Sequence, residues 1–132
     1  MFLNRLNSKE KEAFLKLAHY IARSDNDFSD KQKEIIATYC FEMQINDIDF
    51  NESSFNLDNT LSKFESKESQ KIALLEVMAL VFSDNILHQE EKKVLDAMTE
   101  KFNLSSTLID IYAEWTKAIL AITAQGQALI NI

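Results

Sequence analysis

Acidic side chains beside two Ser-Asp-Asn sequences are the residues of this chain with the clearest capacity for chemistry. They are Asp25, Asp27, Asp84 and Glu91. Hard divalent cations bind clustered carboxylate oxygens, so these four residues are candidate metal ligands. The same residue types close turns and cap helices, and a helix N-terminus favours negative charge without any ligand. Capping is the simpler interpretation, and the spacing alone leaves both interpretations open.

Other residue types that support catalysis are sparse. His19 and His88 are the only histidines, and without a His-Glu-x-x-His spacing they do not predict a catalytic zinc site. Cys40 has no neighbouring motif, so we expect a small core residue there. The sequence Asp47-x-Asp49-x-Asn51 begins like a calcium loop, but Glu52 stands where such a loop needs glycine. The sequence therefore predicts neither an enzyme nor a bound organic cofactor.

The composition also limits the classes of partner that the chain is expected to bind. The 132 residues include 21 acidic and 14 basic side chains, and the net charge of −7 disfavours nucleic acid as a partner. The apolar stretch 72–82 is interrupted by Glu76 and is shorter than the ~20 residues that cross a bilayer. The first residues, 1–7, do not resemble a secretory signal. We expect a single cytoplasmic domain, residues 1–132, without membrane insertion.

The elements that must position the acidic residues are helices. One glycine and no proline leave little turn chemistry, and apolar residues recur with helical spacing. Helices are predicted over about 8–23, 29–43, 58–64, 67–83, 88–102 and 106–128, with Gly126 fraying or ending the last one. The polar connection 44–66 is expected to pack on the core. Helix 67–83 should be the most buried one, with Glu76 partly exposed at its edge.

The chain also repeats itself with an offset of 59 residues. The segment 24–33 falls on 83–92, and each copy has an apolar helix before it and a capped helix after it. Each copy therefore predicts a helix, a Ser-Asp-Asn turn, one buried apolar residue and a second helix. The prediction is an all-α bundle of about five to seven helices, built from two pseudo-repeated helix–turn–helix units.

At the segments 24–32 and 83–91 the chain resembles the TerB-like family, which is named for a tellurite-resistance protein. Helical repeats of that family carry an Ala-Asp-Gly-x-Ile-x-x-x-Glu-like sequence between helices. Here Asn26 and Asn85 replace the two glycines, Gln32 replaces the first glutamate, and Glu91 keeps the second. The resemblance implies a TerB-like helical bundle, a role in stress or tellurite resistance, and divalent-cation binding at the helix junctions.

The last helix carries a second candidate site. We expect its apolar face, which includes Tyr112, Trp115, Ile119 and Ile122, to be core. The alternative is an interface for a protein partner or a second copy at Tyr112, Trp115 and Ile119, because aromatic residues anchor interfaces and no charge follows Lys117. Two functions follow as expectations. The first is a non-enzymatic TerB-like stress domain that binds a divalent cation, and the alternative is a metal-free interaction or homodimerisation module.

Overall fold

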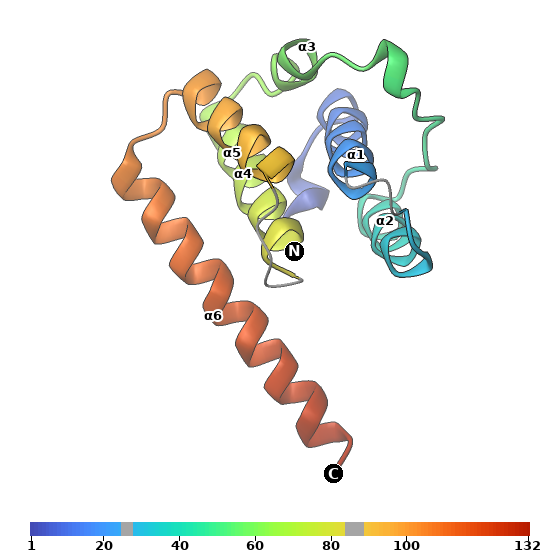
Figure 1. The fold of residues 1–132 in the computed structure, drawn as a ribbon, viewed down its shortest axis with the longest axis vertical. Coiled ribbons are helices and arrows are strands. Elements are labelled where there is room, and N and C mark those ends of the chain that lie inside the picture. Colours follow the sequence, from blue (N-terminus) through green and yellow to red (C-terminus); the bar gives the residue numbers. More distant parts are fainter. Residues whose placement is uncertain (25–27, 84–88) are drawn as a thin grey trace.

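The computed structural model describes residues 1–24, 28–83 and 89–132, and these residues form helices without any strand (Figure 1). In chain order the elements are the 3-10 helix η1 (Leu3–Arg5), α1 (Ser8–Arg23), α2 (Asp30–Met43), the 3-10 helix η2 (Glu52–Ser54), α3 (Leu57–Leu61), α4 (Lys67–Phe82), α5 (Gln89–Phe102) and α6 (Ser106–Ile130). The all-α prediction is therefore confirmed for the part of the chain that is described.

Helices α1 and α2 form one helix–turn–helix unit, and α4 and α5 form its repeat. Both bounds of α4 lie 59 residues after those of α1, and both bounds of α5 lie 59 residues after those of α2. The left-handed residues that end each unit keep the same offset, since Gln44 has φ 57° and Asn103 has φ 53°. The pseudo-repeat is confirmed, and it extends well beyond the segment whose sequence matches.

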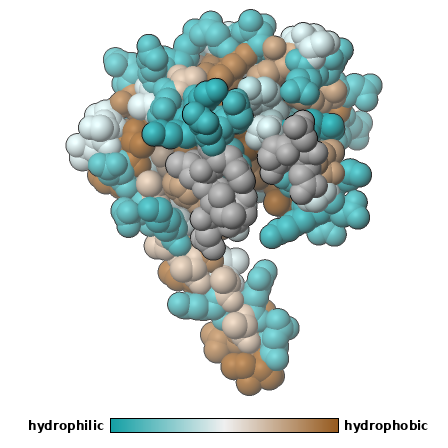
Figure 2. Space-filling view, viewed as in Figure 1, coloured by the Kyte–Doolittle hydropathy of each residue, from teal (hydrophilic) through white to brown (hydrophobic). Residues whose placement is uncertain are grey.

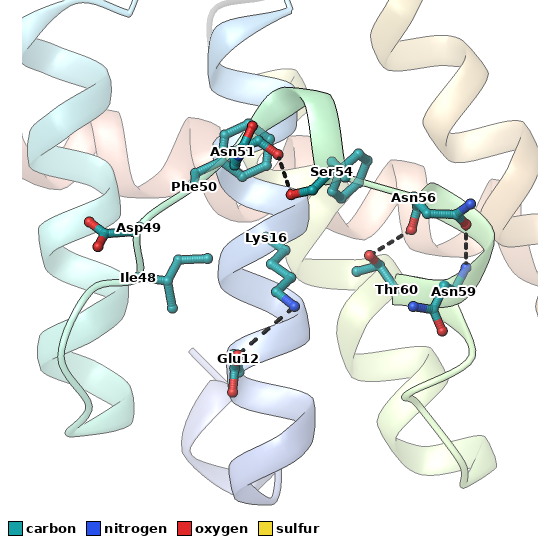
Figure 3. Close-up of a pocket in the computed structure, with 11 residues that line it drawn as sticks. Glu12, Lys16, Ile48, Asp49, Phe50, Asn51, Ser54, Asn56, Asn59 and Thr60 are labelled. Atoms are coloured by element: carbon teal, nitrogen blue, oxygen red, sulfur yellow. Dashed lines mark hydrogen bonds and ion pairs between the residues drawn. The ribbon is translucent and has the colours of Figure 1, made fainter.

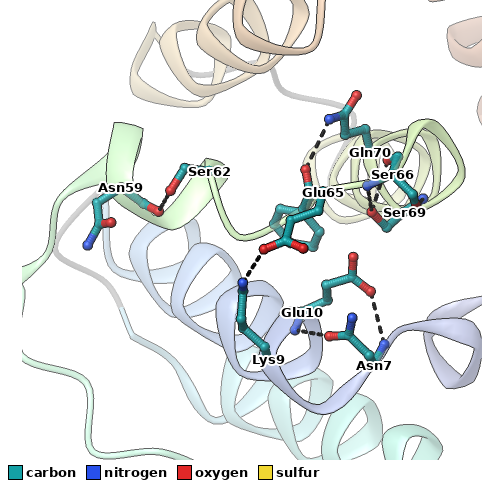
Figure 4. Close-up of polar contacts among 10 residues, drawn as sticks. Asn7, Lys9, Glu10, Asn59, Ser62, Glu65, Ser66, Ser69 and Gln70 are labelled. Atoms are coloured by element: carbon teal, nitrogen blue, oxygen red, sulfur yellow. Dashed lines mark hydrogen bonds and ion pairs between the residues drawn. The ribbon is translucent and has the colours of Figure 1, made fainter.

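The two units also begin alike. Asn7 caps α1 in a capping box with Glu10, whose backbone N–H donates to Asn7 Oδ1 at 2.9 Å. Ser66 caps α4 in the same way with Ser69, whose N–H donates to Ser66 Oγ at 3.0 Å. Figure 4 shows both caps, with an ion pair between Lys9 and Glu65 beside them. Paired caps satisfy donors that a helix N-terminus leaves free, which explains why both predicted starts are confirmed.

The core lies between α1 and α4, which pack against each other. Helix α2 packs on α1, and α5 packs on α4. Helix α4 also contacts α6 and η1, which agrees with the prediction that it is central. Helix α1 shares that role, because its inward side chains are buried just as completely: Phe14, Leu15, Leu17 and Ala18.

The polar connection after α2 packs on the core as predicted. Phe55 stacks on Tyr20 of α1 with a ring-centroid distance of 4.5 Å, while Leu61 and Phe64 are buried. Helix α3 ends earlier than the predicted residue 64. The cause is a tight turn in which the Phe64 N–H donates to Leu61 O at 3.2 Å, and this turn places Phe64 against Phe102.

Helix α6 differs most from the expectation. It continues to Ile130, two residues beyond the predicted end, so Gly126 does not end the helix. Its first half lies along α4, and its second half extends beyond the other helices (Figure 1). From residue 121 onward every residue is exposed except the half-buried Gly126. The interpretation of the Ile122 face as core is also wrong, because Ile122 is 60% exposed.

Candidate functional site

A cavity of about 200 Å³ lies where the two units meet. Its walls come from the end of α1, the start of α2, the end of α4 and the start of α5. Gln32 and Glu91, which occupy equivalent positions in the two repeats, both line it. Glu91 is only 7% exposed. The fold therefore brings the two matching positions of the repeat to one place.

The residues around this cavity have the same local geometry in both units. The Ser24 hydroxyl donates to Ile21 O at 2.8 Å, and the equivalent Ser83 hydroxyl donates to Leu80 O at 2.7 Å. At the first junction, Gln32 completes a capping box by accepting the Ser29 N–H at 2.9 Å. Capping is therefore the observed role of Gln32.

Three of the four candidate metal ligands, Asp25, Asp27 and Asp84, lie outside the described residues. Glu91 is described, and it lines the junction cavity. Within the described ranges, no group of three or more histidine, cysteine, aspartate or glutamate side chains is placed to hold a metal ion. What the structure shows of this site is thus the convergence of Gln32 and Glu91.

Glu76 does not lie at an exposed helix edge, so that expectation is wrong. It is 4% exposed, and its Oε1 accepts the Met1 ammonium and the Phe2 N–H, each at 2.8 Å. Glu42 binds the same segment, accepting the Met1 ammonium at 3.0 Å and the Leu3 N–H at 2.9 Å. A buried carboxylate needs such partners. These two glutamates therefore fix the start of the chain between α2 and α4.

Charges in this cluster change the proton affinity of neighbouring groups. Desolvation lowers the pKa of the Met1 ammonium, but the hydrogen bonds and charges of Glu76 and Glu42 outweigh it and leave that pKa raised. Burial, together with the same two carboxylates, raises the pKa of Tyr39. The cluster therefore holds a cation and a neutral phenol, and its polar groups serve to position the chain.

His19 forms a second polar cluster. It is 3% exposed, and its Nε2 lies 2.8 Å from Asp47 Oδ1. Phe50 stacks on the imidazole with ring centroids 5.6 Å apart. Asp47 also accepts the Ile48 N–H at 2.8 Å, so this carboxylate ties the connection after α2 to α1. His88 lies outside the described residues.

Cys40 is half-buried rather than fully buried. Burial and, secondarily, the negative charge of Asp47 raise the pKa of its thiol. A raised pKa keeps the group protonated near neutral pH, and only the thiolate is an effective nucleophile. This environment favours a packing role for Cys40 over a role as a nucleophile.

A cavity of about 420 Å³ lies between α1 and the connection that contains η2 (Figure 3). Its polar groups make local contacts. Ser54 donates to Asn51 O at 3.2 Å, and Asn56 accepts the Asn59 N–H at 2.8 Å and the Thr60 hydroxyl at 2.8 Å. These groups shape the loop around the cavity.

One side of α6 and the residues directly after it carry a row of mainly apolar residues, which we call the α6 stripe; all of them are exposed except the half-buried Leu108. Its members alternate in spacing between three and four residues: Leu108, Ile111, Trp115, Ala118, Ile122, Gln125, Leu129 and Ile132. Trp115 is 40% exposed, Ile122 60% and Leu129 69%. Figure 2 shows hydrophobic surface on the narrow extension that this helix forms. The spacing is that of a coiled-coil seam.

A different side of α6 faces the core. Thr116 is fully buried, and Ile109, Tyr112 and Ala113 pack against the core. Of the three predicted interface residues, Trp115 lies on the α6 stripe, whereas Tyr112 and Ile119 are half-buried beside it. Counting residues at heptad spacing could have separated the two sides, because the inward residues and the stripe occupy different positions of the repeat.

Comparison of the chain with known protein families, curated proteins and solved structures found no match. Among the described helices, none has both the length and the apolar character that a bilayer crossing requires.

Proposed function

We propose that this chain is a non-enzymatic, cytoplasmic interaction module that binds a partner helix along the α6 stripe. One observation carries the proposal: the fold buries one side of α6 and leaves a second apolar side exposed with coiled-coil spacing. Contiguous exposed apolar surface marks interaction sites in soluble proteins. Residues at this spacing insert between the side chains of a facing helix.

The outer half of α6 adds a physical argument. From residue 121 onward its side chains have little cover from the rest of the described protein. Isolated helices shorter than about 12 to 15 residues are marginal in water. Packing against a second helix supplies the burial that this segment lacks, and it removes the apolar side chains from water.

The α6 stripe also defines the chemistry of the partner. No ionisable side chain occurs between Lys117 and the last residue, so charge pairing cannot select the partner along this segment. The shape of the stripe and its apolar contacts must therefore select the partner. The proposed partner is therefore a helix whose apolar residues repeat every three and four positions.

Photocrosslinking tests this proposal. A benzoylphenylalanine placed at Ile122, on the stripe, is compared with one at Ala124, on another side of the same exposed segment, in cells that produce the protein. We expect discrete crosslinked species from position 122 and few from position 124. Equal or absent crosslinking at the two positions contradicts a binding surface at the stripe.

A second function is a TerB-like stress or tellurite-resistance role in which the repeat junction binds a divalent cation. The meeting of Gln32 and buried Glu91 at one cavity supports it. In this proposal the cation offsets repulsion between Glu91 and the acidic residues Asp25, Asp27 and Asp84, and thereby orders the junction. The cation would then alter the helix packing that a partner meets.

Thermal melts after chelation, repeated with calcium, magnesium, manganese and zinc, test this second function. A cation that binds only the folded state stabilises it by about 2.7 kcal/mol at a hundredfold excess over Kd. We expect one cation to raise the melting temperature selectively, and Glu91→Gln to reduce that rise. An unchanged melting temperature with every cation assigns the acidic residues to capping instead.

A further inference from the structure

We infer that the helix that covers the α6 stripe is α6 of a second copy of this chain, packed antiparallel. This inference rests on the proposed function of the stripe and names its partner. The first argument is that the stripe is complementary to itself. From Trp115 to Ile132 its residues are spaced by three, four, three, four and three positions, and this pattern is the same in both directions along the chain. Such a surface can face a second copy of itself across a two-fold axis.

The second argument is charge. Each copy carries a net charge of −7, so two copies repel each other unless their contact keeps the charged helices apart. Residues 118–132 have no ionisable side chain. If two such segments overlap antiparallel, roughly 20 Å of uncharged helix separates the two acidic bodies. This separation exceeds the Debye length of about 8 Å at physiological salt, whereas parallel packing sets the bodies side by side.

The third argument is size matching along the stripe. In an antiparallel pair centred between residues 123 and 124, Ala118 faces Leu129 of the second copy, and Ile122 faces Gln125. Each contact recurs by symmetry on the other side of the centre. The small Ala118 thus meets the large Leu129, which keeps the two helices at an even separation, as interdigitated packing requires.

Self-association of the purified full-length chain is the first test. We expect sedimentation analysis to show the mass rising from one copy to two as the concentration increases. Ile122→Glu combined with Leu129→Glu should keep the protein monomeric at the highest concentration. Both side chains are exposed, so these changes leave the core intact. The matched control, Ala124→Glu with Gln127→Glu, adds the same charge to other exposed positions of the segment and should behave like the wild type.

A wild type that stays monomeric overturns the inference, and so does a stripe variant that still forms dimers. These results are distinguishable from failure of the proposed function. If the purified chain is monomeric but position 122 crosslinks to a different protein in cells, the stripe does bind a partner. That partner is then not a second copy of this chain.

Disulfide crosslinking in a Cys40→Ala background tests the orientation. Ala118→Cys and Leu129→Cys chains are oxidised separately and as a mixture. The antiparallel register predicts a crosslinked dimer in the mixture and little in either variant alone, because position 118 faces position 129. Crosslinking of each variant with itself indicates parallel packing and overturns the orientation. Absence of crosslinking in all three samples overturns the register.

Discussion

At the residue scale, the least predictable side chain is Glu76. The sequence shows an isolated carboxylate within an apolar helix but gives no partner for it, because that partner is the start of the chain, 75 residues away. The structure provides two donors to one carboxylate oxygen at 2.8 Å each. Hydrogen bonds to charged groups each contribute about 1.5 to 3 kcal/mol, so these two bonds offset the cost of burying the Glu76 carboxylate.

Replacing the charge of Glu76 should therefore destabilise the fold. We expect Glu76→Gln to lower the free energy of unfolding by about 1.5 to 3 kcal/mol, measured by urea denaturation. Glu68→Gln is the control, since Glu68 forms an exposed ion pair with Arg5 and should cost less than about 1 kcal/mol. Equal effects of the two substitutions contradict the structural role of the buried carboxylate.

The Met1 ammonium should make stability depend on pH. Its pKa is raised above 8.0 in the folded state, so the folded state binds the proton more tightly than the unfolded state does. This contribution is fully present below pH 8 and is lost as the pH rises through the folded-state pKa. We expect the free energy of unfolding to fall as the pH rises above 8, and to fall less steeply in Glu76→Gln. Parallel pH profiles in the two proteins contradict the coupling.

At the element scale, most helices could be predicted because their ends carry local signals. Asn7 and Ser29 cap the helices that follow them, and periodic apolar residues mark the faces that are buried. The sequence match of the repeat extended over ten residues, whereas the structural repeat extends over whole helices. Packed positions tolerate different apolar residues, such as Phe14 in the first unit and Ala73 in the second, so structure repeats where sequence does not.

The exposed side of α6 could not be predicted in the same way. An apolar helix side shows that something covers it, but the sequence does not show whether the cover is the same chain or a partner. Two apolar sides occur on this helix, and the spacing of their residues does not show which side the chain itself covers. The convergence of Gln32 and Glu91 at one cavity is likewise not evident from the sequence, because the local signals at each junction do not show how the two units pack together.

Gly126 offers a test of α6 as a continuous helix. A Cβ added there meets no described atom within 4 Å, so Gly126→Ala is sterically free. Alanine favours a helix by about 1 kcal/mol relative to glycine. We expect a larger helical circular dichroism signal at 222 nm and slower fraying of residues 121–130. Ala128→Gly, at another exposed position, should have the opposite effect, and a reduced signal in Gly126→Ala would contradict a continuous helix.

At the scale of the whole molecule, the two repeated units and α6 serve different purposes. The units bury the core between α1 and α4 and bring their junctions to a single cavity. Helix α6 has no counterpart after the first unit, where η2 and α3 lie instead. It contacts α4 with one side and carries the α6 stripe away from the other helices (Figure 1). The two repeated units thus form the helical body from which α6 extends.

Amide hydrogen exchange of residues 121–130 at low and high protein concentration tests this account most directly. If a second copy covers the α6 stripe, protection of these amides should rise with concentration, while protection of α1 and α4 stays unchanged. Ile122→Glu with Leu129→Glu should abolish the concentration dependence. Fast exchange of residues 121–130 at both concentrations would contradict the account, because it would show that no second copy covers the stripe.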